Sequence, residues 1–143
     1  LCGTQDIHIA RTNIESYMSK TREEGHWVIS ADRLVVAWFT LVAMPGCCGI
    51  VISTNSAIYD KWRGKGLGTL LNKMRVQMAY ELGYSVMLCT DVMHNRPQQK
   101  ILRKNNWRKI FVFTNRRTTN EVSLDCIPLS STGIALGFDP HAR

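Results

Sequence analysis

The alternation of apolar and polar side chains predicts that the chain begins with a strand and a helix. Residues 6–10 alternate between polar and apolar, which is typical of a short strand with one buried face. Thr12 or Asn13 can cap a helix over residues 14–20, because both side chains accept hydrogen bonds from backbone N–H groups at a helix start. Gly25 ends this region.

The next segments predict three strands joined by two turns. Residues 26–30 and 34–44 are rich in Val, Ile, Trp and Phe, and the short polar link 31–33 between them favours a hairpin. Pro45-Gly46 favours a second turn, since both residues are common in turns. This turn returns the chain into a long strand over residues 47–58.

The sequence then predicts an amphipathic helix and an interior strand. Apolar residues recur at helical spacing along one face, at Leu67, Leu70, Leu71, Met74, Met78 and Leu82. Gly83 is well suited to end this helix. Residues 85–90 are almost continuously apolar, which indicates a strand buried on both faces.

A second helix and a final hairpin complete the pattern. Asn95 can cap a helix with Pro97 in its first turn, and the helix is expected to end near Asn105. Residues 110–114 and 121–127 then form two strands across a polar link. The predicted order is therefore β-α-β-β-β-α-β-α-β-β.

Length and composition fit one globular domain. With 143 residues, of which 45% are hydrophobic and 20% charged, the chain can bury one core but is short for two. We expect a domain over residues 1–128 and a C-terminal tail over 129–143, where little periodicity occurs. No apolar run reaches the roughly 18 residues of a membrane span. Because no signal peptide begins the chain, a cytoplasmic protein is expected.

The cysteines predict neither a disulfide framework nor a metal site. Their number, five, is odd, and no C-x-x-C spacing occurs. Four of them, Cys47, Cys48, Cys89 and Cys126, are in apolar segments that read as strands. We expect these to be reduced and mostly buried, behaving as small hydrophobic side chains.

The formal net charge of +7 raises the question of a nucleic-acid partner. The basic side chains are spread over residues 61–73, 100–109 and 116–117, and no long basic run occurs. A basic surface together with an anionic small ligand explains this distribution better than nucleic-acid binding does.

The most distinctive stretch is WRGKGLGTLL, residues 62–71, where three glycines alternate with other residues just before a helix. Glycine permits positive φ and close approach of a ligand to the backbone. Backbone N–H groups at a helix start then bind phosphate, and Arg63 and Lys65 add positive charge. The spacing matches neither a P-loop nor a dinucleotide-binding fingerprint. The pattern Arg-x-x-Gly-x-Gly resembles the acyl-CoA pyrophosphate loop of the GNAT superfamily of N-acetyltransferases.

A second motif supports the resemblance. Residues 95–107, NRPQQKILRKNNW, are similar to the family pattern N-x-x-A-x-x-L-Y-x-x-x-G-F. Asn95, Ile101 and Trp107 match the asparagine, the leucine and the final aromatic residue of that pattern. In the family, the asparagine contacts the pantetheine arm or the incoming amine, and here Asn95 could also simply cap the helix.

Three positions depart from the pattern. Gln98 replaces the alanine, and Asn106 replaces the glycine, which is a mild change because Asn tolerates the left-handed conformation. Leu102 replaces the tyrosine that usually protonates the departing thiolate. Leucine has no proton to donate, so a tyrosine placed there is expected to restore the donor close to the sulfur.

The resemblance covers about residues 6–127 and implies a single α/β domain with a GNAT-like fold. Its sheet would be mixed, mostly antiparallel, and splayed where the long strand meets the next one. The family activity is direct transfer of acetyl from acetyl-CoA to a primary amine, without a metal. The residues implied to contact acetyl-CoA are Ser56, Ala57, Ile58, Arg63, Gly64, Lys65, Gly66, Leu67, Gly68, Thr69 and Asn95.

The general base is left open by the sequence. No Glu occurs in residues 47–58 to deprotonate an amine. Asp91 and His94 follow the interior strand and are the catalytic candidates, since His titrates near neutrality and a carboxylate can accept a proton. Asp91 could equally cap a turn, and His94 could be merely solvated. Tyr59 and Tyr84 are weaker candidates for a substitute acid.

Two other functions stay open at this stage. A non-catalytic acyl-CoA-binding or regulatory domain would keep the glycine loop without the acid. A nucleic-acid or protein-interaction module would use the basic surface. For an enzyme, the acceptor amine could belong to a small molecule, a peptide or a protein lysine. No membrane partner is expected, and a homodimer is compatible with the sequence.

Overall fold

A computed structural model describes residues 7–12 and 23–129 of the chain. The helix predicted over residues 14–20 and the tail beyond Leu129 lie outside the described residues. The elements are β1 (Ile7–Thr12), β2 (Glu23–Ala31), β3 (Leu34–Ala43), β4 (Ile50–Ile58), the 3-10 turn η1 (Asp60–Trp62), α2 (Leu67–Glu81), β5 (Val86–Val92), α3 (Arg96–Lys104), β6 (Arg108–Thr114) and β7 (Glu121–Pro128). Apart from the undescribed helix, this is the predicted order.

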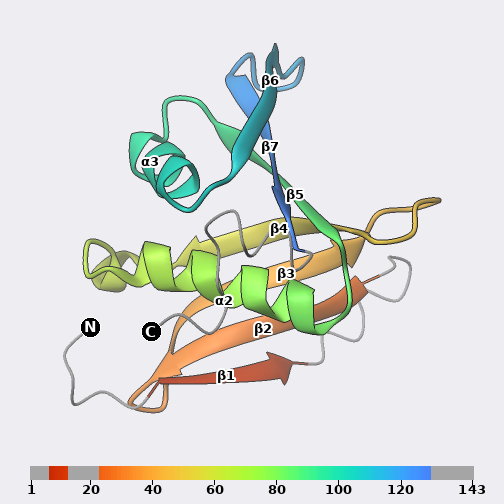
Figure 1. Ribbon diagram of the computed structural model, residues 1–143. Helices are drawn as coiled ribbons and strands as arrows, with labels where there is room; N and C mark the ends of the chain where they lie inside the picture. Colours follow the sequence, from red (N-terminus) through yellow and green to blue (C-terminus); the bar gives the residue numbers. More distant parts are fainter. Residues whose placement is uncertain (1–6, 13–22, 130–143) are drawn as a thin grey trace.

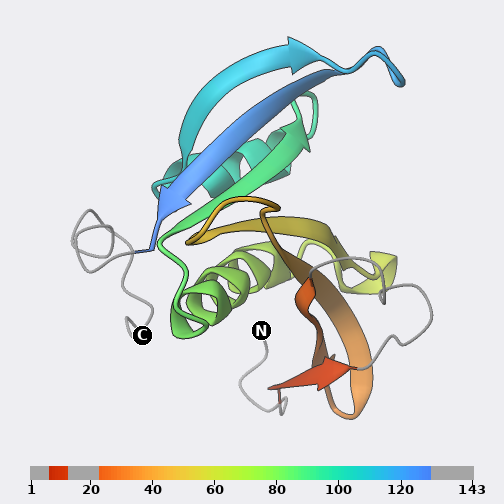
Figure 2. The same ribbon diagram turned by 90° about the vertical axis from the view of Figure 1, so that its right-hand side faces the viewer.

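The described strands form one seven-stranded sheet in the order β1-β2-β3-β4-β5-β7-β6. All neighbouring strands are antiparallel except β4 and β5, which are parallel. Figure 1 and Figure 2 show the two parts of the sheet turning away from one another, with α2 against β3 and β4 and with α3 beside β5. The mixed, splayed sheet that the resemblance implied is confirmed.

The hairpin between β2 and β3 follows from its two turn residues. Asp32 and Arg33 have φ values of 50° and 66°, so both adopt the left-handed conformation. Turns with two positive φ values match the twist of antiparallel strands, which explains why two residues suffice here. The predicted hairpin is therefore confirmed.

The long strand begins later than its apolar pattern indicated. Residues 45–49 form two successive turns, and β4 begins at Ile50. Gly46 and Gly49 have φ values of 71° and 82°, which interrupt an extended chain. Cys47 and Cys48 consequently lie exposed in the turn, so the prediction that they are buried was wrong. Cys89 is buried as predicted, and Cys126 is half-buried.

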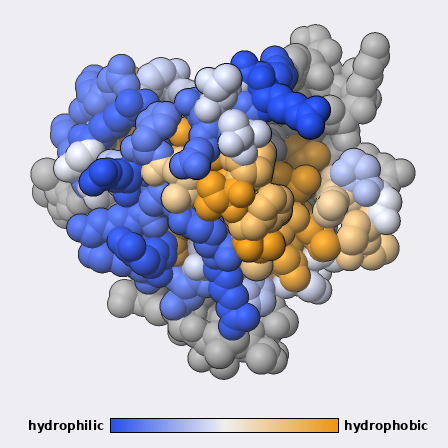
Figure 3. All heavy atoms as spheres, turned by 90° about the horizontal axis from the view of Figure 1, so that it is seen from above, coloured by the Kyte–Doolittle hydropathy of each residue, from blue (hydrophilic) through white to orange (hydrophobic). Residues whose placement is uncertain are grey.

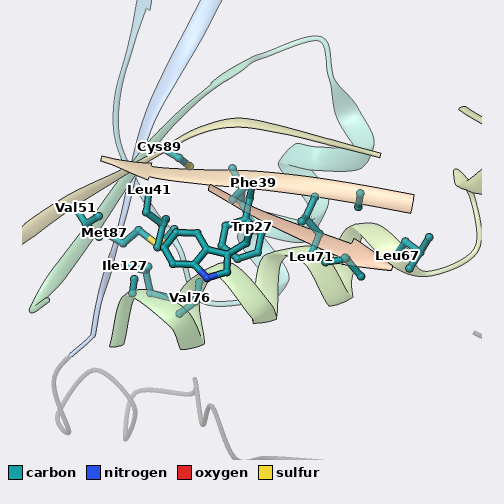
Figure 4. Close-up of a cluster of buried hydrophobic side chains, with 14 of the residues drawn as sticks. Trp27, Phe39, Leu41, Val51, Leu67, Leu71, Val76, Met87, Cys89 and Ile127 are labelled. Carbon is teal, nitrogen blue, oxygen red and sulfur yellow. The ribbon is translucent and has the colours of Figure 1, made fainter. Parts of the chain in front are cut away.

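The core lies between α2 and the sheet (Figure 4). Trp27 stacks on Phe39 with ring centroids 5.3 Å apart, and both side chains are buried. The predicted helix is present, and all of its predicted face residues except Leu82 are buried or pack against the core; Asn72 and Arg75 are buried in addition. The fully buried residues of α2 are Leu67, Leu71, Asn72, Arg75, Val76 and Ala79. Leu82, which was predicted to be on the buried face, is exposed.

Helix α3 begins and ends as the sequence indicated. The Asn95 side chain accepts a hydrogen bond from the backbone N–H of Gln98, and Pro97 lies in the first turn. Asn106 adopts the left-handed conformation with a φ of 66°, which accounts for Asn in place of Gly. Leu102 is only 2% exposed and belongs to the core, so it does not face open space.

The outer strand β6 is exposed along its whole length, and its residues 110–113 are apolar. Ile110, Phe111, Val112 and Phe113 are its exposed large hydrophobic side chains. Figure 3, a view onto the end of the molecule where β6 lies, shows apolar residues gathered beside a strongly hydrophilic region. Separately, none of the described helices is long and apolar enough to cross a membrane.

Candidate functional site

A cleft opens where β4 and β5 separate. The two strands pair at only three positions, Ile50 with Val86, Val51 with Met87 and Ile52 with Leu88. Beyond these positions β4 stays paired with β3, and β5 stays paired with β7. The resulting cleft has a volume of about 820 Å³, within the range usual for small-molecule sites. Its walls come from β4, the glycine loop, α2, β5 and α3.

A bulge in β4 shapes one wall of the cleft. Trp38 of β3 pairs with Ala57 and Thr40 pairs with Thr54, so one residue of β3 faces two of β4. Asn55, in the bulge, has a φ of 47°. The following residues of β4, Ser56, Ala57 and Ile58, line the cleft, as predicted for a strand that pairs with a pantetheine arm.

The glycine loop closes one end of the cleft. Gly64 and Gly66 have φ values of 74° and 81°, and a Cβ atom added to either would meet nothing within 4 Å. Gly66 is the N-cap of α2, and no side chain caps this helix. The first N–H groups of α2 are therefore free to bind an anion, which the helix dipole also favours.

The charged and buried residues of the loop have different positions. Arg63 lines the cleft, donates a hydrogen bond from Nε to the carbonyl of Ile58 at 3.2 Å and pairs with Asp60. Lys65 lies over the ring of Trp62, with Nζ 5.0 Å from the ring centroid, and does not line the cleft. Leu67 points into the core, so only its backbone is available to a ligand.

Gly68 has a different role from the other two glycines of the loop. A Cβ atom here would lie 2.8 Å from Cδ1 of Ile101 on α3. Gly68 thus allows α2 and α3 to approach closely beside the cleft. Gly68 and Thr69 both line the cleft, as does Asn95 at the start of α3.

Asp91 is the acidic residue of β5 that lines the cleft. Its carboxyl oxygens lie 3.4 Å from Nδ2 of Asn95 and 3.5 Å from Nε2 of Gln99. Desolvation by burial raises the pKa of Asp91 to about 6, although hydrogen bonds from Val92 and Asn95 and the charge of Arg75 oppose this shift. A carboxyl group with a pKa near neutrality can accept and release a proton at physiological pH.

The other titratable candidates lie elsewhere. His94 is exposed in the turn after β5 and is not part of the cleft wall. Tyr59 is exposed and packs edge-on against Trp38, with ring centroids 5.0 Å apart. Tyr84 packs against the core. Neither tyrosine lines the cleft.

The sequence interpretation missed a buried polar cluster in the cleft wall. Asn72 and Arg75 of α2, together with Cys89 of β5, line the cleft and are almost completely buried. Burial raises the pKa of Cys89 to about 12, so this side chain is a neutral thiol rather than a nucleophilic thiolate. The spacing of three to four residues between Asn72, Arg75 and Ala79 could have indicated this face of α2. The sequence interpretation counted only apolar residues when it assigned the buried face.

The residues of the cleft fit an acyl-CoA. The loop offers free backbone N–H groups, open space in front of Gly64 and Gly66, and the guanidinium of Arg63. These N–H groups and the guanidinium can donate hydrogen bonds to phosphate oxygens. The unpaired backbone edge of β4 can pair with the amide groups of a pantetheine arm. Among the described residues, no group of three or more His, Cys, Asp or Glu side chains is arranged to hold a metal ion.

Comparison with known proteins identifies the fold. No protein-family model matches the sequence, and no curated protein matches it. An IAA acetyltransferase from Bacillus cereus ATCC 14579 superposes with a TM-score of 0.74 at 14% identity, over 86% of this chain and 99% of that one. The ribosomal-protein-S18-alanine N-acetyltransferase from Escherichia coli gives a TM-score of 0.72 at 8% identity, over 87% and 95%.

A third solved structure, a mutant form of the spermidine/spermine N-acetyltransferase SpeG from Vibrio cholerae, gives a TM-score of 0.72 at 11% identity, over 87% and 95% of the two chains. Other matching structures are described as acetyltransferases of the GNAT family. The chain therefore has the GNAT fold.

Proposed function

We propose that this protein is an N-acetyltransferase of the GNAT superfamily that transfers acetyl from acetyl-CoA directly to a primary amine. The observation that carries the proposal is the cleft at the β4–β5 splay, with an anion-binding loop at one end and a titratable carboxyl group on its opposite wall. The GNAT fold agrees with this activity, and the acetyltransferases that share it supply the precedent.

The proposal assigns the holding of acetyl-CoA mainly to backbone groups. The N–H groups at the start of α2 and the Arg63 guanidinium would bind the pyrophosphate. Ser56, Ala57 and Ile58 would pair with the pantetheine amides as an added strand. Acetyl-CoA supplies a thioester, which is an activated acyl donor.

Asp91 is the general base that we favour. It lines the cleft, and its raised pKa of about 6 leaves it ionised at neutral pH yet basic enough to take a proton from an ammonium group. The neutral amine nitrogen then forms a bond to the thioester carbon, and the carbon–sulfur bond breaks with its electron pair going to sulfur. The second amine proton passes to the departing thiolate directly or through water, which gives the amide and CoA. His94 stays a second candidate that would have to act through water, because it does not line the cleft.

Direct transfer agrees better with the cleft than transfer through a cysteine. Cys89 is the cysteine of the cleft wall, and burial keeps its thiol protonated. Catalysis would rest mainly on positioning, since bringing the two reactants together removes much of the entropic barrier.

A second function is favoured by one specific observation. No tyrosine, histidine or glutamate of the described residues lines the cleft, so the departing thiolate has no family-type proton donor there. This agrees with a non-catalytic acyl-CoA-binding domain. A thiolate leaves fairly readily near neutral pH, and for this reason we place the enzyme first.

A binding and turnover experiment tests both functions. Acetyl-CoA and CoA should raise the melting temperature, because a ligand at a hundredfold its Kd stabilises the native state by about 2.7 kcal/mol. CoA release should then be followed with a panel of amines. Stabilisation with turnover supports the enzyme, stabilisation without turnover of any amine selects the binding domain, and no stabilisation at millimolar CoA refutes both.

The proposal includes the remaining expectations from the sequence. We propose that residues 1–128 form the catalytic domain. We also propose a cytoplasmic location, because exposed thiols such as Cys47 and Cys48 persist in a reducing compartment. If two copies associate, the exposed apolar strand β6 is where contact is expected, and light scattering would measure the mass.

A further inference from the structure

The buried face of α2 carries a charge that the fold does not require. Arg75 is 4% exposed and Asn72 is 1% exposed, and both line the cleft. Charged residues are almost never buried to this degree unless they are paired. Core positions of a helix are normally apolar, so these two side chains call for an explanation in terms of what they bind.

The direct partners of Arg75 are all neutral, and they include the buried thiol of Cys89. Its Nη1 donates to Oγ of Ser53 at 3.2 Å, and its Nη2 donates to Oδ1 of Asn72 at 3.2 Å. The guanidinium lies against the ring of Trp107, with Cζ 5.2 Å from the ring centroid. Trp107 in turn donates from Nε1 to Oδ1 of Asn72 at 3.0 Å. The cluster thus joins α2 to β4 and to Trp107, which lies between α3 and β6, by packing and hydrogen bonds.

Two donors of this cluster are unused. Nε of Arg75 and Nδ2 of Asn72 are buried and have no hydrogen-bond partner among the described residues. Leaving a buried donor unsatisfied costs about 1–3 kcal/mol, and more for a charged group. Arginine keeps its proton in proteins, so burial lowers the pKa of Arg75 without removing its charge.

The nearest acids do not neutralise Arg75. Asp91 interacts with it electrostatically, but no ion pair joins them among the described residues, and the Asp91 oxygens face Asn95 and Gln99. Asp125 instead accepts a hydrogen bond from Ser123 at 2.6 Å. Guanidinium groups commonly bind carboxylates through hydrogen bonds, and the two residues with unsatisfied donors, Arg75 and Asn72, both line the cleft.

The phosphates of a bound CoA are not the partner of Arg75. Nine residues separate Gly66 from Arg75, which corresponds to about 13 Å along the helix axis. The anion-binding N–H groups are therefore at the other end of the cleft, and the pantetheine arm between them is uncharged.

We propose that Arg75 and Asn72 bind a carboxylate of the substrate, so that the acceptor is an amine that carries a carboxylate, such as an amino acid. This inference rests on the proposed acetyltransferase function. The positive Arg75 and the negative Asp91 on the same cleft match the two charges of a zwitterion, with the ammonium group toward Asp91. A carboxylate at the far end of the acyl group on CoA would bind to the same N–H groups of Arg75 and Asn72. The experiment separates a carboxylate on the acceptor from a carboxylate on the acyl group.

Matched pairs of substrates test the inference on the unmodified protein. In the acceptor arm, CoA release from acetyl-CoA is compared for amino acids and for their amides, which keep the amine and lose the carboxylate. In the acyl arm, succinyl-CoA and acetyl-CoA are compared as acyl donors to one amine that has no charged side chain. A preference of at least about tenfold in kcat/KM, or 1.4 kcal/mol, is expected for the carboxylate in the acceptor arm. The same preference in the acyl arm alone would assign the carboxylate to the donor.

Variants then connect the preference to the cluster. Arg75→Met should abolish the carboxylate preference by raising KM for the acid far more than KM for the amide, so that the two values become similar. Arg75→Lys should restore part of it, because a charge remains without the planar fork. Lys73→Met is the matched control, since it removes one charge from the exposed face of the same helix and should keep the preference.

The outcomes separate this inference from the proposed function. If CoA stabilises the protein and amines are acetylated with no carboxylate preference in either arm, the inference is wrong and the acetyltransferase stands. Calorimetry gives a readout without turnover: N-acetyl amino acids should bind at least about tenfold more tightly than their N-acetyl amides. Equal binding of the two would overturn the inference even if Arg75→Met fails to fold.

Discussion

At one end of the cleft the groups proposed to bind the donor are mainly backbone groups of residues 64–69, whereas at the other end the groups proposed to bind the acceptor are side chains from α2 and β5. The glycine end has open space and positive φ at Gly64 and Gly66. The far end needs Arg75 and Asn72 of α2 and Asp91 of β5 to line the same cleft. The proposed donor site can therefore be read from a short local motif, whereas the proposed acceptor site cannot. The predictions below test this division.

The largest effect is expected at the side-chain end, for Asp91→Asn. Asparagine keeps the size of the side chain and cannot accept the amine proton, so kcat/KM should fall at least about 100-fold. In the unmodified protein kcat/KM should rise as the pH increases through about 6 and then level off, because the base must be ionised. CoA release between pH 5 and pH 8 measures both.

Asp32→Asn is the control for this variant, because Asp32 is an exposed residue of the β2–β3 turn. It should retain full activity. If Asp91→Asn also retains activity together with the rise through pH 6, then the proton goes to another group, and the assignment of the base is wrong.

Leu102→Tyr should act on stability rather than on catalysis. The sequence interpretation expected a tyrosine here to restore a donor near the sulfur, with a change in kcat below about tenfold. Because Leu102 is 2% exposed and packed in the core, the larger ring should instead lower the free energy of unfolding by about 1–3 kcal/mol. Urea denaturation measures this. Ile110→Tyr, on the exposed strand β6, should cost much less.

A hundredfold gain in kcat from Leu102→Tyr would contradict this expectation. Such a gain would show that the side chain can reach the thiolate and that the native domain lacks its acid, which favours the binding-domain function.

Gly66→Val should weaken the glycine end selectively. The residue has a φ of 81°, and its missing side chain leaves open space where the phosphates are proposed to bind. CoA affinity should fall at least about tenfold, or 1.4 kcal/mol. Gly46→Val is a close control, since Gly46 has a φ of 71° and equally open surroundings in a turn between β3 and β4. Equal loss of CoA affinity in both variants would mean that backbone strain alone is responsible.

The comparison also explains how much the sequence could predict. Local chemistry was readable: the turn at Asp32 and Arg33, the cap at Asn95 and the left-handed glycines follow from the residues themselves. The start of β4 could not be predicted from the sequence, because the apolar residues after Pro45 resemble a strand until Gly49 turns the chain. A hydrophobic pattern cannot distinguish an exposed apolar turn from a buried strand.

The buried face of α2 was predicted incompletely for a related reason. Hydropathy placed Leu70, Met74 and Met78 against the core, where they are partly buried, but it left out Asn72 and Arg75, which are buried and line the cleft. A polar residue is buried only where other elements supply partners, and here those partners are Ser53 and Trp107, far away in the sequence. Side-chain clusters of this kind depend on the tertiary fold and leave little trace in the local pattern.

The smallest effect is expected for His94→Ala, and it decides between the two candidate bases. The sequence interpretation expected a loss of at least about tenfold in kcat/KM, because His titrates near neutrality. The structure places His94 exposed and outside the cleft wall, while Asp91 lines the cleft with a pKa of about 6. We therefore expect His94→Ala to lower kcat/KM by less than about threefold, as for an ordinary surface substitution. The pH profile should keep its rise through about 6, measured with one competent amine from pH 5 to pH 9. A tenfold loss together with a flattened profile would instead make His94 the base, acting through water, and would reduce Asp91 to a residue that holds Asn95 and Gln99.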